Sequence, residues 1–93
     1  MTLSVKQRQT LKAAAHHLRP VIIIGQKGIT ESLSQEADAA LTAHELIKVQ
    51  VQQGEKDYRQ QCAEALTAAT GAELVQQIGK TLVLYRPRPE KAS

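Results

Sequence analysis

Two glycines on either side of a short polar segment offer the most direct chemistry in this chain. Gly25-Gln26-Lys27-Gly28 follows four aliphatic residues and precedes Thr30, a residue type that often caps a helix. Glycine reaches backbone angles that residues with a Cβ avoid, so the segment can turn sharply and leave amide N–H groups pointing outward. Outward amides beside a helix N-terminus attract an anion. We therefore interpret residues 25–28 as a phosphate-binding loop, with Lys27 as its positive charge.

The same loop has a plainer interpretation, because Gly-x-x-Gly often does no more than turn the chain. In KH domains a loop of this form clamps a nucleic-acid backbone, and the charge distribution favours that alternative. Residues 1–28 carry five Lys or Arg and no acid, whereas residues 29–57 carry two Lys and six acids. Glu31 acts against phosphate binding, since a carboxylate in the first turn of a helix competes with an anion there. The first third of the chain is expected to face a polyanion.

The segment before the loop contributes a row of basic residues. Ser4 followed three residues later by Gln7 is a capping-box pattern, which predicts a helix running to about His17. Successive helical residues turn by about 100°, and this places four basic residues beside the apolar stripe: Arg8, Lys12, His16 and Arg19. Most charged helix faces are simply solvated. This row has no carboxylate near it in sequence, so an external anion would relieve its self-repulsion.

We expect the basic row and the loop to lie on one side of the molecule and to receive a polyphosphate chain together. Three further cations are weaker candidates at the margin of that surface: Lys6, Lys80 and Arg86. The chain has two Tyr and no Phe or Trp, so it cannot build the platform on which RRM domains stack bases. Any nucleic-acid contact is therefore expected to be mostly to the backbone.

Length and composition limit the class of protein. Ninety-three residues, 42% of them apolar, make one domain with one modest core. We assign it to residues 1–86, followed by a basic, loose tail at 87–93. The single cysteine, Cys62, cannot form an internal disulfide, and it lies on the apolar stripe of a predicted helix. No apolar run approaches the roughly 20 residues of a membrane span, and the first residues lack the basic-then-apolar layout of a signal peptide. We expect a cytoplasmic monomer without membrane contact.

Hydrophobic periodicity predicts elements in the order α-β-α-β-α-β-β. The helices are expected to begin at the capping residues Ser4, Thr30 and Asp57. The strands are expected at Val21–Ile24, Leu46–Gln52, Glu73–Ile78 and Thr81–Tyr85. A right-handed crossover makes the first two strands parallel, and the Gly79-Lys80 turn makes the last two an antiparallel hairpin. The predicted fold class is a two-layer α/β sandwich, in which one face of the sheet is covered.

Catalysis finds little support in these residues. His16 and His17 point about 100° apart on a helix, so they cannot chelate one metal ion together. The single cysteine leaves no zinc-ligand spacing, and no nucleophile-elbow, Walker or dinucleotide-binding motif is present. We expect no catalytic residues, no metal site and no cofactor.

The chain resembles the CRM-domain family, in particular its stand-alone bacterial YhbY-like RNA-binding proteins. The resemblance covers nearly the whole length and depends on five stretches: Leu3-Ser4 with Lys6-Gln7, Leu11-Lys12 with Ala15-His16, Pro20 to Thr30, His44 to Val49, and Ile78 to Arg86. The last two are far more specific than the Gly-x-x-Gly loop alone.

The resemblance implies a fold similar to the C-terminal domain of translation initiation factor 3, with three helices and a four-stranded mixed sheet in the order 1-2-4-3. It also implies RNA binding in precursors of the large ribosomal subunit, with residues Gly25 to Gly28 in contact with RNA. The family loop often has its basic residue directly after the first glycine. This chain has Gln26 at that position and Lys27 next.

The leading hypothesis is a non-enzymatic protein that binds ribosomal RNA of the large-subunit precursor and acts in ribosome assembly. The alternative is a protein-interaction adaptor that joins the same precursor without specific RNA contact. Its contact surface would be the acidic outer face of the second helix, which carries Glu31 and Asp38. Binding to protein-free ribosomal RNA distinguishes the two.

Overall fold

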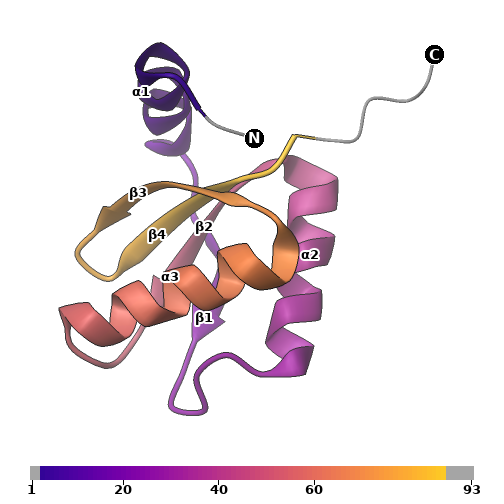
Figure 1. Cartoon of the computed structure of the whole chain (residues 1–93), viewed down its shortest axis with the longest axis vertical. Helices are drawn as coiled ribbons and strands as arrows, with labels where there is room; N and C mark the ends of the chain where they lie inside the picture. The colour runs from indigo at the N-terminus through magenta and orange to yellow at the C-terminus, as the bar shows by residue number, and fades with distance from the viewer. Residues whose placement is uncertain (1–2, 88–93) are drawn as a thin grey trace.

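The computed structural model describes residues 3–87 as seven elements in the predicted order (Figure 1). The helices are α1 (Val5–Ala15), α2 (Glu31–His44) and α3 (Lys56–Thr70). The strands are β1 (Pro20–Ile24), β2 (Leu46–Val51), β3 (Glu73–Ile78) and β4 (Thr81–Tyr85). Apart from Pro87, the tail predicted at 87–93 lies outside the described residues.

The four strands form one mixed sheet in the order β1-β2-β4-β3, the order that the resemblance implied. β1 and β2 are parallel, and β4 pairs antiparallel with both β2 and β3. Gly79 in the β3–β4 turn has φ 54°, a left-handed conformation that two-residue hairpin turns favour. The predicted α/β fold with a mixed four-stranded sheet is confirmed.

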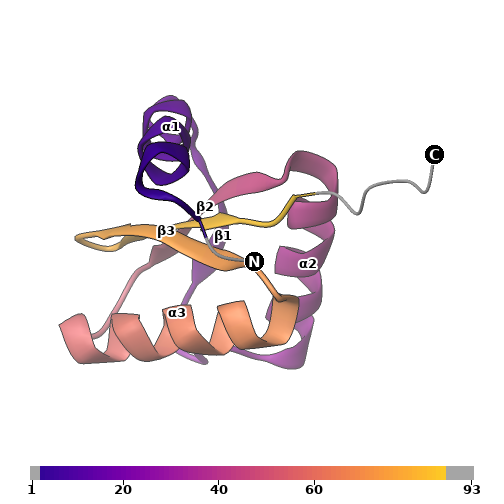
Figure 2. The ribbon, with the colours of Figure 1, turned by 45° about the horizontal axis from the view of Figure 1, so that its top comes forward.

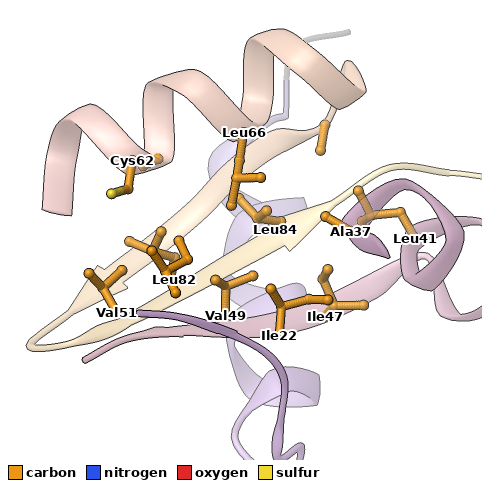
Figure 3. Close-up of a cluster of buried hydrophobic side chains, with 13 residues drawn as sticks. Ile22, Ala37, Leu41, Ile47, Val49, Val51, Cys62, Leu66, Leu82 and Leu84 are labelled. Atoms are coloured by element: carbon orange, nitrogen blue, oxygen red, sulfur yellow. The ribbon is translucent and has the colours of Figure 1, made fainter. Parts of the chain in front are cut away.

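The main core lies between the sheet and the helices α2 and α3 (Figure 3). Side chains alternate across a strand, so every second residue of β2 points into this core, from Ile47 to Val51. Leu41 of α2 and Leu66 of α3 are fully buried against these strands. Cys62 is also buried, as its place on the apolar stripe predicted.

Helix α1 packs on the opposite face of the sheet (Figure 2). Its apolar residues Leu11 and Ala15 meet Val75 of β3 and Val83 of β4 in a second, smaller cluster. We expected this face to remain open, and that expectation is wrong for the part beneath α1. On the same face of the sheet, β1 lies beyond α1 and stays uncovered, with Ile23 half exposed.

Two helix ends differ from the prediction. Ser4 and Gln7 form the predicted capping box, but α1 ends at Ala15, two residues before the expected end. Helix α3 begins earlier than expected, with Glu55 as its N-cap, so Asp57 lies in the first turn. A carboxylate is favourable there too, because it faces the positive end of the helix dipole. The sequence pattern alone did not show whether Glu55 or Asp57 is the N-cap of α3.

Candidate nucleic-acid interface

The glycine loop forms a tight turn between β1 and α2 (Figure 1). The Gly28 N–H donates to the Gly25 carbonyl at 3.1 Å, and Gly28 has φ 68°. Thr30 caps α2 as predicted, since its hydroxyl accepts a hydrogen bond from the Leu33 N–H at 3.1 Å. Gln26 and Lys27 are exposed in this turn. The loop therefore presents a positive charge to solvent close to a helix N-terminus.

Tyr58 of α3 supports this loop from behind. A Cβ on Gly28 would lie 2.9 Å from the Tyr58 hydroxyl oxygen, and a Cβ on Gly54 would lie 2.2 Å from the ring. Gly25, in contrast, has no such neighbour within 4 Å. A hydrogen bond with the Cys62 thiol raises the pKa of Tyr58, and desolvation raises this pKa further, so the hydroxyl is uncharged at neutral pH. Tyr58 was not among the site residues predicted from the sequence.

The β3–β4 turn lies at the same end of the sheet as the glycine loop. The Gln52 N–H donates to the Ile24 carbonyl at 3.0 Å, and the Val51 N–H donates to the Lys80 carbonyl at 2.7 Å. These bonds join the ends of β1, β2 and the hairpin turn. Lys27 and Lys80, both exposed, therefore share one end of the molecule, which we call the loop end.

Arg8, the first residue of the predicted basic row, points at the sheet. Its Nη1 donates to the carbonyls of Leu74 and Val75 at 2.7 and 2.9 Å. The pairing of β3 with β4 shifts register between Leu74 and Gln76, so Val75 is an extra residue in the strand. Arg8 satisfies carbonyls at this bulge and anchors α1 on β3.

The other members of the row separate around the end of α1. Lys12 and His16 line a cleft between α1 and the sheet together with Lys48 of β2. Arg19 lies beyond the helix and lines a different hollow, next to Val21 and His44. Lys48 was not among the predicted site residues. Its position between the apolar residues of an alternating strand does, however, predict a side chain on the solvent-facing side of the sheet.

The row and the loop are not adjacent in the structure. They lie at opposite ends of β1, and Figure 1 shows α1 at the top and the loop between β1 and α2 at the bottom. Five residues of extended strand separate these ends by roughly 16 Å. Any surface that the row and the loop share therefore extends along this strand.

Arg86, a predicted marginal candidate, is occupied inside the fold. Its Nη1 donates to the Asp38 carboxylate and, at 2.8 Å, to the Thr70 carbonyl. Its Nη2 donates to the Asp38 carbonyl at 3.0 Å and to the Thr42 hydroxyl at 2.9 Å. This side chain ties the end of β4 to α2 and α3. It also engages one of the two acids on the outer face of α2.

The described residues hold no group of three His, Cys, Asp or Glu side chains that could bind a metal ion. Within the same part of the chain, no helix is long and apolar enough to cross a membrane. Lys12, Lys27 and Lys48 have no ion-pair partner among residues 3–87. The positive charges at both ends of β1 are thus available to an external anion.

These features define a class of small α/β domain with a mixed 1-2-4-3 sheet, a glycine loop after the first strand and cations on the α1 side of the sheet. The family model of the CRS1 / YhbY (CRM) domain matches residues 3–86. The chain therefore belongs to the CRS1 / YhbY (CRM) domain family, as the resemblance indicated.

Relatives and a solved structure resemble almost the whole chain. A protein named "RNA-binding protein" from Haemophilus influenzae is 48% identical over 89 residues, which covers 96% of this chain and 90% of the relative. "Probable RNA-binding protein YqeI" from Bacillus subtilis is 40% identical over 88 residues, covering 95% of this chain and 92% of the relative. The solution structure of the hypothetical protein SAV1595 from Staphylococcus aureus has a TM-score of 0.83 at 42% identity and covers 96% of this chain and 93% of its own.

Proposed function

We propose that this protein is a non-enzymatic RNA-binding module, which binds ribosomal RNA of the large-subunit precursor and acts in ribosome assembly. The observation that supports it most is the set of exposed or half-exposed lysines at both ends of β1 that have no acidic partner among residues 3–87. Unpaired cations of this kind are the electrostatic signature of a surface that binds a nucleic-acid backbone. The names of its relatives agree with this class of ligand.

The proposed interface has two anchoring regions. At the loop end, the turn from Gly25 to Gly28 contributes Lys27 and the backbone amides that the Gly28–Gly25 hydrogen bond does not use, with Lys80 nearby. At the other end, Lys12 of α1 and His16 just after the helix contribute, with Lys6 and Arg19 at the margins. Arg8 acts there by holding the helix in place, and Arg86 is left out because its guanidinium is used within the fold.

The uncovered part of the sheet connects the two regions. On its α1 side, Val21 and Ile23 of β1 are 51% and 50% exposed, and Gln50 of β2 is half-buried beside Ile23. An RNA strand that crosses this surface meets cations at both ends and short apolar and amide side chains between them. Specificity then comes mainly from the shape of the RNA, as few groups there can read base edges.

Equilibrium binding to protein-free ribosomal RNA at several salt concentrations tests this proposal. Wild type is expected to bind with a steep salt dependence. Lys12→Gln and Lys27→Gln should each weaken binding and reduce the slope of log K against log salt by about 0.7 for a single-stranded contact. Lys56→Gln, the same change at an exposed lysine of α3 to which the proposal gives no role, is the matched control.

Two results would contradict the proposal. Wild type that binds the RNA no better than an unrelated basic protein of equal charge would favour the adaptor alternative. Unchanged affinity and slope in both variants would show that RNA binds elsewhere on the protein. Binding to assembly precursors isolated from cells, followed by sequencing of crosslinked RNA, then identifies the particle and the contact site.

A further inference from the structure

A small cleft lies between α1 and the sheet, about 180 Å³ in volume. Its lining comes from four elements and from the residue that follows α1: Lys12, Ala15, His16, Lys48, Gln76, Ile78, Thr81 and Val83. None of these residues is acidic. Only Lys12 and His16 were predicted from the sequence as candidates for a binding site.

Strand pairing fixes the floor of this cleft. Lys48 of β2 is the partner of Val83 in β4, and Val83 is the partner of Gln76 in β3, so the three residues form one row across the sheet. Directly paired residues have Cβ atoms about 5 Å apart. Thr81 lies two residues before Val83 and therefore on the same face. The floor thus places an ammonium group and an amide on either side of a buried valine, with a hydroxyl beside them.

Helix α1 forms the wall of the cleft. Ala15 is 1% exposed and packs against the sheet, while Lys12 and His16 flank it on the open side. Two ammonium groups from different elements face one cleft, and neither has an ion-pair partner among the described residues. The buried Ala15 and Val83 exclude water from its base, which strengthens electrostatic attraction there. An anion would relieve the repulsion between the two lysines.

We propose that this cleft is a phosphate-binding site, in which the ammonium groups of Lys12 and Lys48 hold one phosphate group of bound RNA. The His16 imidazole, the Thr81 hydroxyl and the Gln76 amide can each donate a hydrogen bond to its oxygens. The inference rests on the proposed RNA-binding function, and it assigns a site that is separate from the glycine loop. The bound phosphate group is either an internal phosphodiester or a terminal phosphate of the RNA.

Titration of the isotopically labelled protein with inorganic phosphate, followed by NMR, tests the site without any RNA. Chloride at the same ionic strength is the control. Phosphate is expected to shift the amide signals of Thr81 and Val83, and these shifts should be lost in Lys48→Gln but kept in Lys56→Gln. The dispersed spectrum of each variant also shows that it is folded. Equal shifts with chloride, or phosphate shifts confined to the glycine loop, would overturn the inference.

A double-mutant cycle with RNA tests whether two lysines share one phosphate. Lys12→Gln and Lys48→Gln should each weaken binding roughly fourfold at 0.15 M salt. This is the effect of losing the counterion release that accompanies one phosphate contact on a single strand. Because they hold the same group, the double variant should lose less than the product of the two effects. Lys12→Gln combined with Lys27→Gln should lose the full product, since these residues lie at opposite ends of β1. Multiplicative effects for Lys12 and Lys48 would contradict a shared phosphate.

The two sources of the phosphate are separated with one short RNA prepared with a 5′-phosphate or a 5′-hydroxyl. Equal affinity for both forms, with sensitivity to Lys48→Gln, supports an internal phosphodiester. Tighter binding of the phosphorylated form, lost in Lys48→Gln, supports a terminal phosphate. Absence of RNA binding by wild type refutes the proposed function, whereas RNA binding that Lys48→Gln leaves unchanged refutes the cleft alone.

Discussion

At the scale of single residues, the two loop glycines have different reasons to be glycine. Gly28 has a left-handed φ and faces the Tyr58 hydroxyl. At Gly25, in contrast, a Cβ would meet no atom within 4 Å. Gly28→Ala is therefore expected to lower the free energy of unfolding by about 1–2 kcal/mol, because a Cβ is disfavoured in the left-handed region. Gly25→Ala should change it much less. Urea unfolding followed by circular dichroism measures both variants, and equal losses would contradict this assignment.

Arg86 offers a second prediction at this scale. Its guanidinium makes four hydrogen bonds to α2 and to the last residue of α3, two of them to Asp38. Arg86→Met should destabilise the fold by about 2–3 kcal/mol, since it leaves a part-buried carbonyl and a carboxylate without their donor. The folded variant should bind RNA as wild type does. A stable variant with weakened RNA binding would return Arg86 to the interface.

At the scale of elements, α1 is held on the sheet by one long side chain as well as by its apolar stripe. Arg8 lies on the same side of the helix as Leu11 and Ala15, and it donates to two carbonyls at the β3 bulge. Arg8→Met keeps much of the apolar stem but removes both hydrogen bonds, which is expected to cost about 1.5–3 kcal/mol. Hydrogen exchange of amides in α1 should accelerate more than that of amides in α2 and α3.

Lys12→Met is the matched control for that experiment. It removes the same charge from the same helix, but no hydrogen bond of the Lys12 ammonium to residues 3–87 is present. It should leave hydrogen exchange in α1 nearly unchanged. Similar acceleration in both variants would mean that charge, and not the contact with β3, holds α1 on the sheet.

At the scale of the whole molecule, the separation between α1 and the loop end makes RNA length a variable. Two anchors at opposite ends of β1 bind a long strand together, so each raises the effective concentration of the other. In a series of shortened RNAs, affinity should fall sharply once one strand no longer reaches both ends. The shortest RNAs should respond to Lys12→Gln or to Lys27→Gln, but not to both. Equal sensitivity to both changes at every length would contradict two separate anchors.

Much of this architecture could be predicted from local patterns. The capping box at Ser4, the cap at Thr30, the alternation in β2 and the Gly79 turn are properties of neighbouring residues, and each was found where it was predicted. Short-range sterics and hydrogen bonds decide such features, so a few adjacent residues suffice. Sheet order was available only through resemblance to a family.

The roles of the basic residues were decided by tertiary structure. Helical spacing placed Arg8 in the same row as Lys12, but only the packing of α1 on the β3 bulge turned its guanidinium toward backbone carbonyls. Lys48 joined Lys12 and His16 because β2 and β4 pair beneath α1, a contact between segments far apart in sequence. The sequence by itself determined which elements form and how much positive charge they carry. Long-range pairing determined which of those charges stay available, because a long cationic side chain reaches whichever partner the fold brings near.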